Sequence, residues 1–187
     1  MKLANLENFD KIHEEVAKVM EQELEKCGSL QATIQAEHDK GWEQVKLRME
    51  QLQAAKQKLQ EQKKAAKEKA EAYVKDLEDA VSAAEAASSV LKEAVDSLTE
   101  ATDKLKPDQV NDMIFSIDTA TKEANEAYQV CTELVRKNDV MKGTDPDLKE
   151  LKEQNNRLMQ RMAACSMTKD TAIKSSASVK TEALKKA

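Results

Sequence analysis

A hydrophobic repeat through the middle of the chain constrains the fold more than any other feature of the sequence. Alternate steps of three and four residues from Trp42 to Leu105 meet 19 positions without a break in phase, and only Lys56 and Lys63 among them are polar. A period of 3.5 residues held over such a length is typical of a left-handed coiled coil. We therefore expect one long heptad-repeat helix over residues 42–105, about 95 Å in length at 1.5 Å per residue.

The composition favours long helices around a thin core. Charged residues make up 35% of the 187 residues and aromatic residues only 3%, and there are 3 glycines and 2 prolines. Between residues 66 and 101 the repeat is mostly alanine, which buries little apolar area per turn, so this part of the helix needs neighbours along its length. We predict an all-α fold, an elongated antiparallel helical bundle or coiled coil with one long central helix.

Residues 1–41 are expected to form an N-terminal helix followed by a bend. Apolar residues three and four apart mark one face of this helix from Leu6 to Leu24, and Gly28 is suited to its C-terminal end. Gly41 is either a second bend or a weak point in a continuing helix, and the sequence leaves both alternatives open. We expect the N-terminal helix to fold back on the first half of the long helix.

Prolines and a glycine divide the rest of the chain into shorter segments. We expect residues 108–141 to form a third helix with a broad apolar face. This helix should pack back on the alanine-rich half of the long helix. A turn at Gly143 precedes a short heptad helix over residues 146–167. Residues 168–187 have a sparse apolar stripe, so a flexible or frayed tail is expected there.

Asn155 allows two interpretations of the short heptad helix. It occupies an a position of the repeat that Leu151 and Leu158 continue. A buried asparagine at an a position is typical of a parallel dimer, in which it fixes the register. Three heptads are short for an independent zipper, and the alternative is a third bundle helix with Asn155 at a wet edge.

The charges alternate in blocks along the chain. The net charge is −4 over residues 1–41, +4 over 42–75, −10 over 76–148 and +5 over 149–187. Such alternation favours antiparallel folding or head-to-tail assembly, although solvated faces of separate helices would give the same pattern.

The sequence contains no recognisable catalytic, cofactor-binding or metal-binding constellation. Its two histidines, His13 and His38, lie far apart in the sequence and have no set of further ligands. The three cysteines, Cys27, Cys131 and Cys165, are too widely spaced for a disulfide framework or a zinc site and are expected to act as small apolar residues. We therefore predict that the protein is not an enzyme and binds no cofactor. We also expect it to be intracellular, in the cytoplasm, and to have no transmembrane segment.

A lysine-rich run lies within the long helix between Lys56 and Lys69. It could contact an anionic membrane surface or an acidic filament, or its lysines could cover the seam with their aliphatic stems. Nucleic acid is not an expected partner, because arginine is scarce in the run and no aromatic residue within it could stack on a base.

These patterns predict a non-enzymatic structural or scaffolding coiled-coil protein. We expect it to assemble with itself, or with filamentous, cytoskeletal or other helical protein partners, through its helical seams. The residues predicted to form the assembly interface are seam residues of the long and the short heptad helix: Trp42, Leu52, Leu59, Leu151, Asn155 and Leu158.

About 25 residues of the third helix and the loop before it suggest a second function. The segment from Leu105 to Val130 resembles the fourth helix of ESCRT-III membrane-remodelling proteins. The resemblance implies a membrane-remodelling polymer subunit as the alternative function. The chain departs from that family because it lacks a strongly basic N-terminal hairpin and an evident acidic C-terminal tail. The residues that carry the resemblance are Pro107, Asp108, Gln109, Val110, Met113, Ile117, Ala124, Asn125 and Glu126.

Overall fold

A computed structural model describes residues 8–101, 105–143 and 145–186, and every regular element within them is a helix. The chain divides into two compact units, Met1–Ala65 and Ala66–Ala187, and the long helix contributes to both. The prediction of an all-α fold with one long helix is confirmed, since that helix has 71 residues. In chain order the elements are α1 (Phe9–Glu23), the 3₁₀ helix η1 (Leu24–Leu30), α2 (Gln31–Ala101), α3 (Pro107–Lys137), the 3₁₀ helices η2 (Val140–Lys142) and η3 (Pro146–Leu148), and α4 (Lys149–Lys186).

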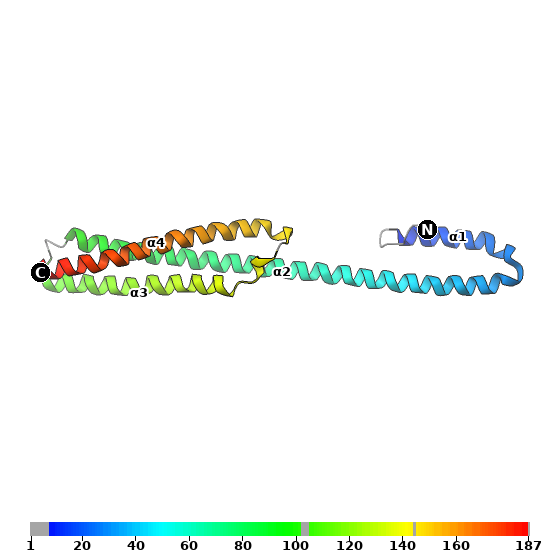
Figure 1. Cartoon of the computed structure of the whole chain (residues 1–187), viewed down its shortest axis with the longest axis horizontal. Coiled ribbons are helices and arrows are strands. Elements are labelled where there is room, and N and C mark those ends of the chain that lie inside the picture. Colours follow the sequence, from blue (N-terminus) through cyan, green and yellow to red (C-terminus); the bar gives the residue numbers. More distant parts are fainter. Residues whose placement is uncertain (1–7, 102–104, 144, 187) are drawn as a thin grey trace. The chain divides into compact units, whose positions relative to one another are not determined.

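In the first unit, α1 turns back on the beginning of α2 (Figure 1). The reversal lies in η1, where Gly28 has a φ of 55°, a left-handed conformation that glycine adopts at little cost. The helix α2 then starts at Gln31 and continues through Gly41. The bend is therefore confined to residues 24–30, and Gly41 lies inside a continuing helix.

The second unit is an elongated antiparallel bundle of three helices (Figure 1). Residues 66–101 of α2, the whole of α3 and the whole of α4 run up, down and up. One core cluster joins Leu98 of α2 to Val110 of α3 and Ala183 of α4, and a second cluster joins Leu77 to Cys131 of α3 at the other end. The prediction that the third helix packs along the C-terminal half of the long helix is confirmed by these clusters.

Local sequence signals set the ends of the bundle helices. At the start of α3, the backbone N–H of Lys106 donates to Gln109 Oε1 at 3.0 Å, and Pro107 fills the first helical position, where no N–H donor is needed. Before α4, the carboxylate of Asp145 accepts from the backbone N–H of Asp147 at 3.0 Å. Both starts are where the prolines and their polar neighbours predict them.

The buried stripe of α2 in the bundle is wider than the predicted seam. Leu77 and Leu91 are fully buried, as the heptad repeat predicts, but Val81 is also 0% exposed although it lies one residue beyond the predicted position Ala80. Ala80 itself is only half-buried. The expectation of a mainly alanine seam is therefore wrong for this half of α2, because packing against two neighbouring helices buries a third position in each heptad. The residues at that third position are Val74, Val81, Ser88 and Val95.

The expectation of a frayed tail over residues 168–187 is corrected by the structure. The helix α4 continues to Lys186, and Ala172, Ser176 and Ala183 are buried along it. These side chains are small, so the sequence shows little hydrophobic periodicity, yet small residues allow a helix to lie close to its neighbours. The segment is thus part of the third bundle helix.

Candidate helix-binding site

In the first unit, the heptad positions of α2 that follow Met49 are exposed. Met49 is 5% exposed, whereas each residue from 50 to 65 is exposed. Within this stretch Leu52 is 43% and Leu59 55% exposed. We call Leu52, Lys56, Leu59 and Lys63 the exposed stripe, since these residues continue the seam on one face of the helix.

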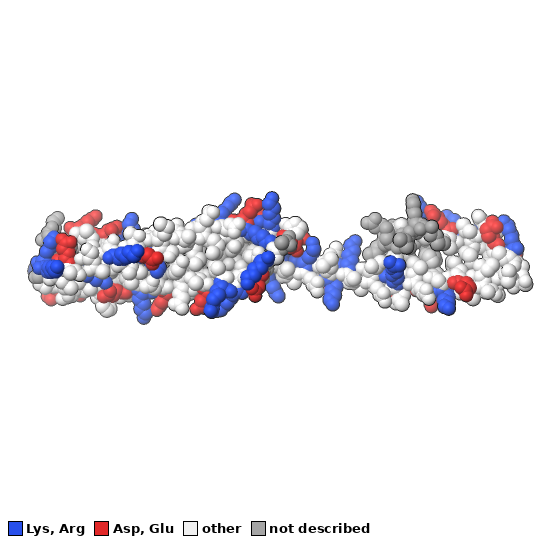
Figure 2. Space-filling model, viewed as in Figure 1, with Lys and Arg blue, Asp and Glu red and all other residues white. Residues whose placement is uncertain are grey.

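The exposed stripe is narrow and lies in a basic part of the helix. The positions beside it hold Gln53, Ala55, Gln60 and Gln62, so no bulky apolar residue widens the stripe. Residues 51–65 carry four lysines and one glutamate, a net charge of +3. Figure 2 shows blue lysine side chains along this part of α2. A two-position apolar stripe fits one partner helix, whereas a wider one fits two neighbours.

Trp42, the first of the predicted interface residues, lies within the first unit and joins its helices. Its ring stacks on Phe9 of α1 at 5.2 Å between centroids, on His13 of α1 at 4.3 Å and on His38 of α2 at 6.4 Å. The Nδ1 atom of His38 also lies 3.0 Å from the carboxylate of Asp39. Trp42 therefore stabilises the contact between α1 and α2 within the first unit.

The predicted interface residues of the fourth helix lie in the second unit. Leu158 is 5% exposed, and Leu151 packs against the same core cluster. Asn155 is half-buried, and its Oδ1 atom is buried without a hydrogen-bond partner. Since α4 is a bundle helix of its own chain, Leu151 and Leu158 are not available to a partner. Of the six predicted residues, only Leu52 and Leu59 lie together on an open face.

Charged residues on α4 connect it to both other bundle helices. The alternating charge blocks of the sequence favour such contacts but do not identify the pairs. Arg161 donates to the two carboxylate oxygens of Glu85 on α2 at 3.0 and 2.6 Å, and this guanidinium lowers the pKa of Glu85. Lys169 is 8% exposed, donates to Asn125 on α3 at 2.9 Å and lies 5.2 Å from the ring of Tyr128. Partners so far apart in sequence carry no periodic signal.

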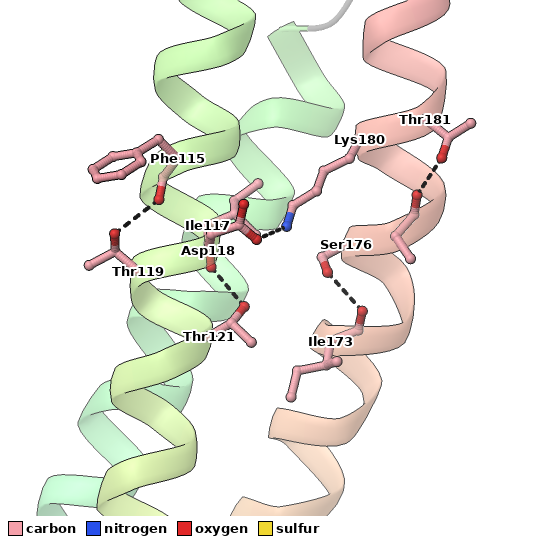
Figure 3. A network of polar contacts seen from close by, with 10 residues as sticks. Phe115, Ile117, Asp118, Thr119, Thr121, Ile173, Ser176, Lys180 and Thr181 are labelled. Carbon is pink, nitrogen blue, oxygen red and sulfur yellow. Dashed lines mark hydrogen bonds and ion pairs between the residues drawn. The ribbon is translucent and has the colours of Figure 1, made fainter.

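A third inter-helix pair, between Lys180 of α4 and Asp118 of α3, lies farther along the bundle (Figure 3). Around it, Thr121 donates to the carbonyl of Ile117 at 2.7 Å, and Ser176 to the carbonyl of Ile173 at 2.7 Å. These hydroxyls bond to their own helices and present no donor pair to a substrate. The network holds helices together and resembles no catalytic arrangement.

The buried thiols lie inside the bundle. Cys131 is 0% and Cys165 5% exposed, and the Sγ atom of Cys165 lies 3.2 Å from Ser88 Oγ. Burial raises the pKa of the Cys131 thiol, and the nearby Cys165 adds to the effect. A protonated, buried thiol is a poor nucleophile and acts as a small apolar side chain. Among the described residues, no group of three or more His, Cys, Asp or Glu side chains could hold a metal ion.

Comparisons with known proteins add no functional information. No family model, curated protein or solved structure matches the chain. The resemblance of residues 105–130 to an ESCRT-III helix therefore stays a prediction. Across the part of the chain that the structure describes, no helix is long and apolar enough to cross a membrane.

Proposed function

We propose that this protein is a non-enzymatic helical scaffold that pairs with a helix of another chain through the exposed stripe of α2. One observation supports the proposal above all others: the leucines of one heptad repeat are buried in one half of α2 and exposed in the other. Leu77 and Leu91, at a positions, are 0% exposed, whereas Leu52 and Leu59, at d positions of the same repeat, are 43% and 55% exposed.

The exposed leucines are a disadvantage unless another chain covers them. Burial of apolar surface stabilises a contact by roughly 25 cal/mol per Å², so two leucines one heptad apart contribute a few kcal/mol when a partner covers them. A scattered surface leucine needs no explanation, but leucines spaced by one heptad form a continuous stripe that a helix can follow.

A photoreactive amino acid tests this function in cells that contain the protein. Placed at position 59, within the exposed stripe, it should cross-link to discrete partner chains. At Glu61, which points away from the stripe, the same group should give little product. Adding Leu52→Gln to the variant with the group at position 59 should remove the cross-links. Equal products at positions 59 and 61, or none at either, would refute the proposed function.

The alternative function, an ESCRT-III-like membrane-remodelling subunit, has one supporting observation in the structure. Lys56 and Lys58 lie in a run of exposed residues, where an anionic surface could approach them. Sedimentation of the full chain with anionic liposomes tests this alternative. Salt-sensitive co-sedimentation that Lys56→Glu and Lys58→Glu abolish would favour it, and absence of binding at low salt would remove it.

A further inference from the structure

The lysines of the exposed stripe carry information about its partner. Lys56 and Lys63 occupy seam positions seven residues apart, between and beyond the exposed leucines. A charged residue at a core position of a coiled coil costs stability and selects the partner and the register. The stripe therefore discriminates between helices by the charge they place opposite these two lysines.

Parallel pairing with a second copy of the same stripe is unfavourable. In register, an a position of one helix faces the a position of the other, so Lys56 would face Lys56 and Lys63 would face Lys63 of the second copy. The flanking positions offer no compensation, since Gln53, Gln60 and Gln62 are uncharged. Two like-charge contacts would thus be placed in a seam of only two leucine layers.

Antiparallel pairing with a second copy gains no charge attraction either. In that arrangement each a position faces a d position, so Lys56 would lie beside Leu59 of the second copy, and Leu52 beside Lys63. The flanking contacts would join glutamine to glutamine and Ala55 to glutamine. Such a pair keeps four lysines in the seam and brings no opposite charge into it from the second copy.

We propose that the partner of the exposed stripe is an acidic helix of a different protein. This helix places apolar residues against Leu52 and Leu59 and a carboxylate within reach of each of Lys56 and Lys63, with the carboxylates seven residues apart. The net charge of +3 over residues 51–65 adds a favourable field for an acidic chain and speeds its encounter. The inference rests on the proposed function, because it names the partner of the same stripe.

Two synthetic helical peptides of three heptads serve as probes for the full chain. Both carry leucine at every d position, and one has glutamate and the other lysine at the a positions. Fluorescence anisotropy at low salt should show that the protein binds the glutamate peptide at least tenfold more tightly than the lysine peptide. Raising the salt concentration should reduce the difference in affinity between the two peptides, because salt screens exposed charge pairs.

Charge reversal on the stripe provides the decisive comparison. The double variant Lys56→Glu and Lys63→Glu should reverse the preference and bind the lysine peptide more tightly. A matched control, Lys58→Glu and Lys64→Glu, changes the net charge equally but lies outside the stripe, so it should keep the preference for the glutamate peptide. All four positions are exposed, and circular dichroism should show an unchanged helix content.

Three results would overturn the inference. Equal binding of both peptides, or of neither, would show that charge does not select the partner. Equal effects of the two double variants would place recognition outside the stripe. Concentration-dependent dimerisation in sedimentation equilibrium, abolished by Leu52→Gln and Leu59→Gln without peptide binding, would identify a second copy as the partner. That last outcome would leave the proposed function intact, whereas the photocross-linking at position 59 tests the function itself.

Discussion

The two halves of α2 share one heptad register but have different surroundings. Around Leu77 and Leu91 the helix is buried by α3 and α4, whereas around Leu52 and Leu59 it is exposed. The two halves differ within the register, where only the exposed half carries the lysines Lys56 and Lys63, and they also differ beside it. The position after each d residue is apolar or small in the bundle half, as at Val74 and Val81, but is Gln53 and Gln60 in the other half. The width of an apolar stripe thus indicates how many neighbours a helix has.

The largest contrast between the two halves should come from glutamate at a seam leucine. Leu77→Glu or Leu91→Glu places a charge in a core position that is 0% exposed and should lower the free energy of unfolding by about 4 kcal/mol. Leu59→Glu, in the same register but 55% exposed, should change it by less than about 0.5 kcal/mol. Urea denaturation followed by circular dichroism measures all three. A large effect of Leu59→Glu would show that its own chain already covers this leucine.

The third buried position of the bundle half can be tested with two valines of the same helix. Val81→Ala should lower the free energy of unfolding by about 2 kcal/mol, since the side chain is 0% exposed and its removal leaves a cavity. Val90→Ala is the matched control, because Val90 is 53% exposed, and it should have an effect within about 0.5 kcal/mol. Equal effects would mean that the core does not extend beyond the heptad positions.

Much of this architecture could be predicted from the sequence, and the failures have physical reasons. The phase of Leu77, Leu91 and Leu98 gave the long helix and one side of the core, because bulky residues with a regular period have few alternatives. The burial of Ser176 and Ala183 in the last helix was missed, since small residues produce little periodic signal. Contacts between helices depend on tertiary arrangement, which a periodic pattern does not encode.

The candidate site was predictable only in part, for a related reason. Leu52 and Leu59 lie exposed on one face of α2, and their role as interface residues stays a prediction, because the heptad pattern is the same for a covered and an uncovered helix. Leu151 and Leu158 have the same spacing of apolar residues and lie within the bundle. Only the neighbouring helices of the fold, which cover one segment and not the other, separate the two cases.

Asn155 is a polar exception within the bundle and predicts a smaller, stabilising effect. Its Oδ1 atom is buried without a hydrogen-bond partner, so Asn155→Leu removes an unsatisfied acceptor and adds apolar contact. The free energy of unfolding should rise by about 1 kcal/mol, and the solution mass measured by light scattering should not change. A change in mass would support the interpretation of this helix as a dimeric zipper. The bundle half would then also bind a second chain, as the exposed stripe is proposed to do.

The smallest expected effect concerns the ion pair at the edge of the bundle. The side chains of Arg161 and Glu85 are 40% and 38% exposed, so Arg161→Gln should cost only about 0.5 kcal/mol near neutral pH. Because the folded state has the lower pKa for Glu85, the pair stabilises the bundle above the ordinary pKa of a glutamate and loses its effect as the pH falls through the lowered value. The stabilities of the wild type and of Arg161→Gln, measured by urea denaturation across this acidic range, should therefore converge at low pH.

A difference in stability that persists after Glu85 is protonated would mean that Arg161 acts through the packing of its aliphatic stem. In that case apolar contact, and not charge, would stabilise the bundle half even at its solvent-exposed edge. Charge would then act only at the exposed stripe, where it selects the partner.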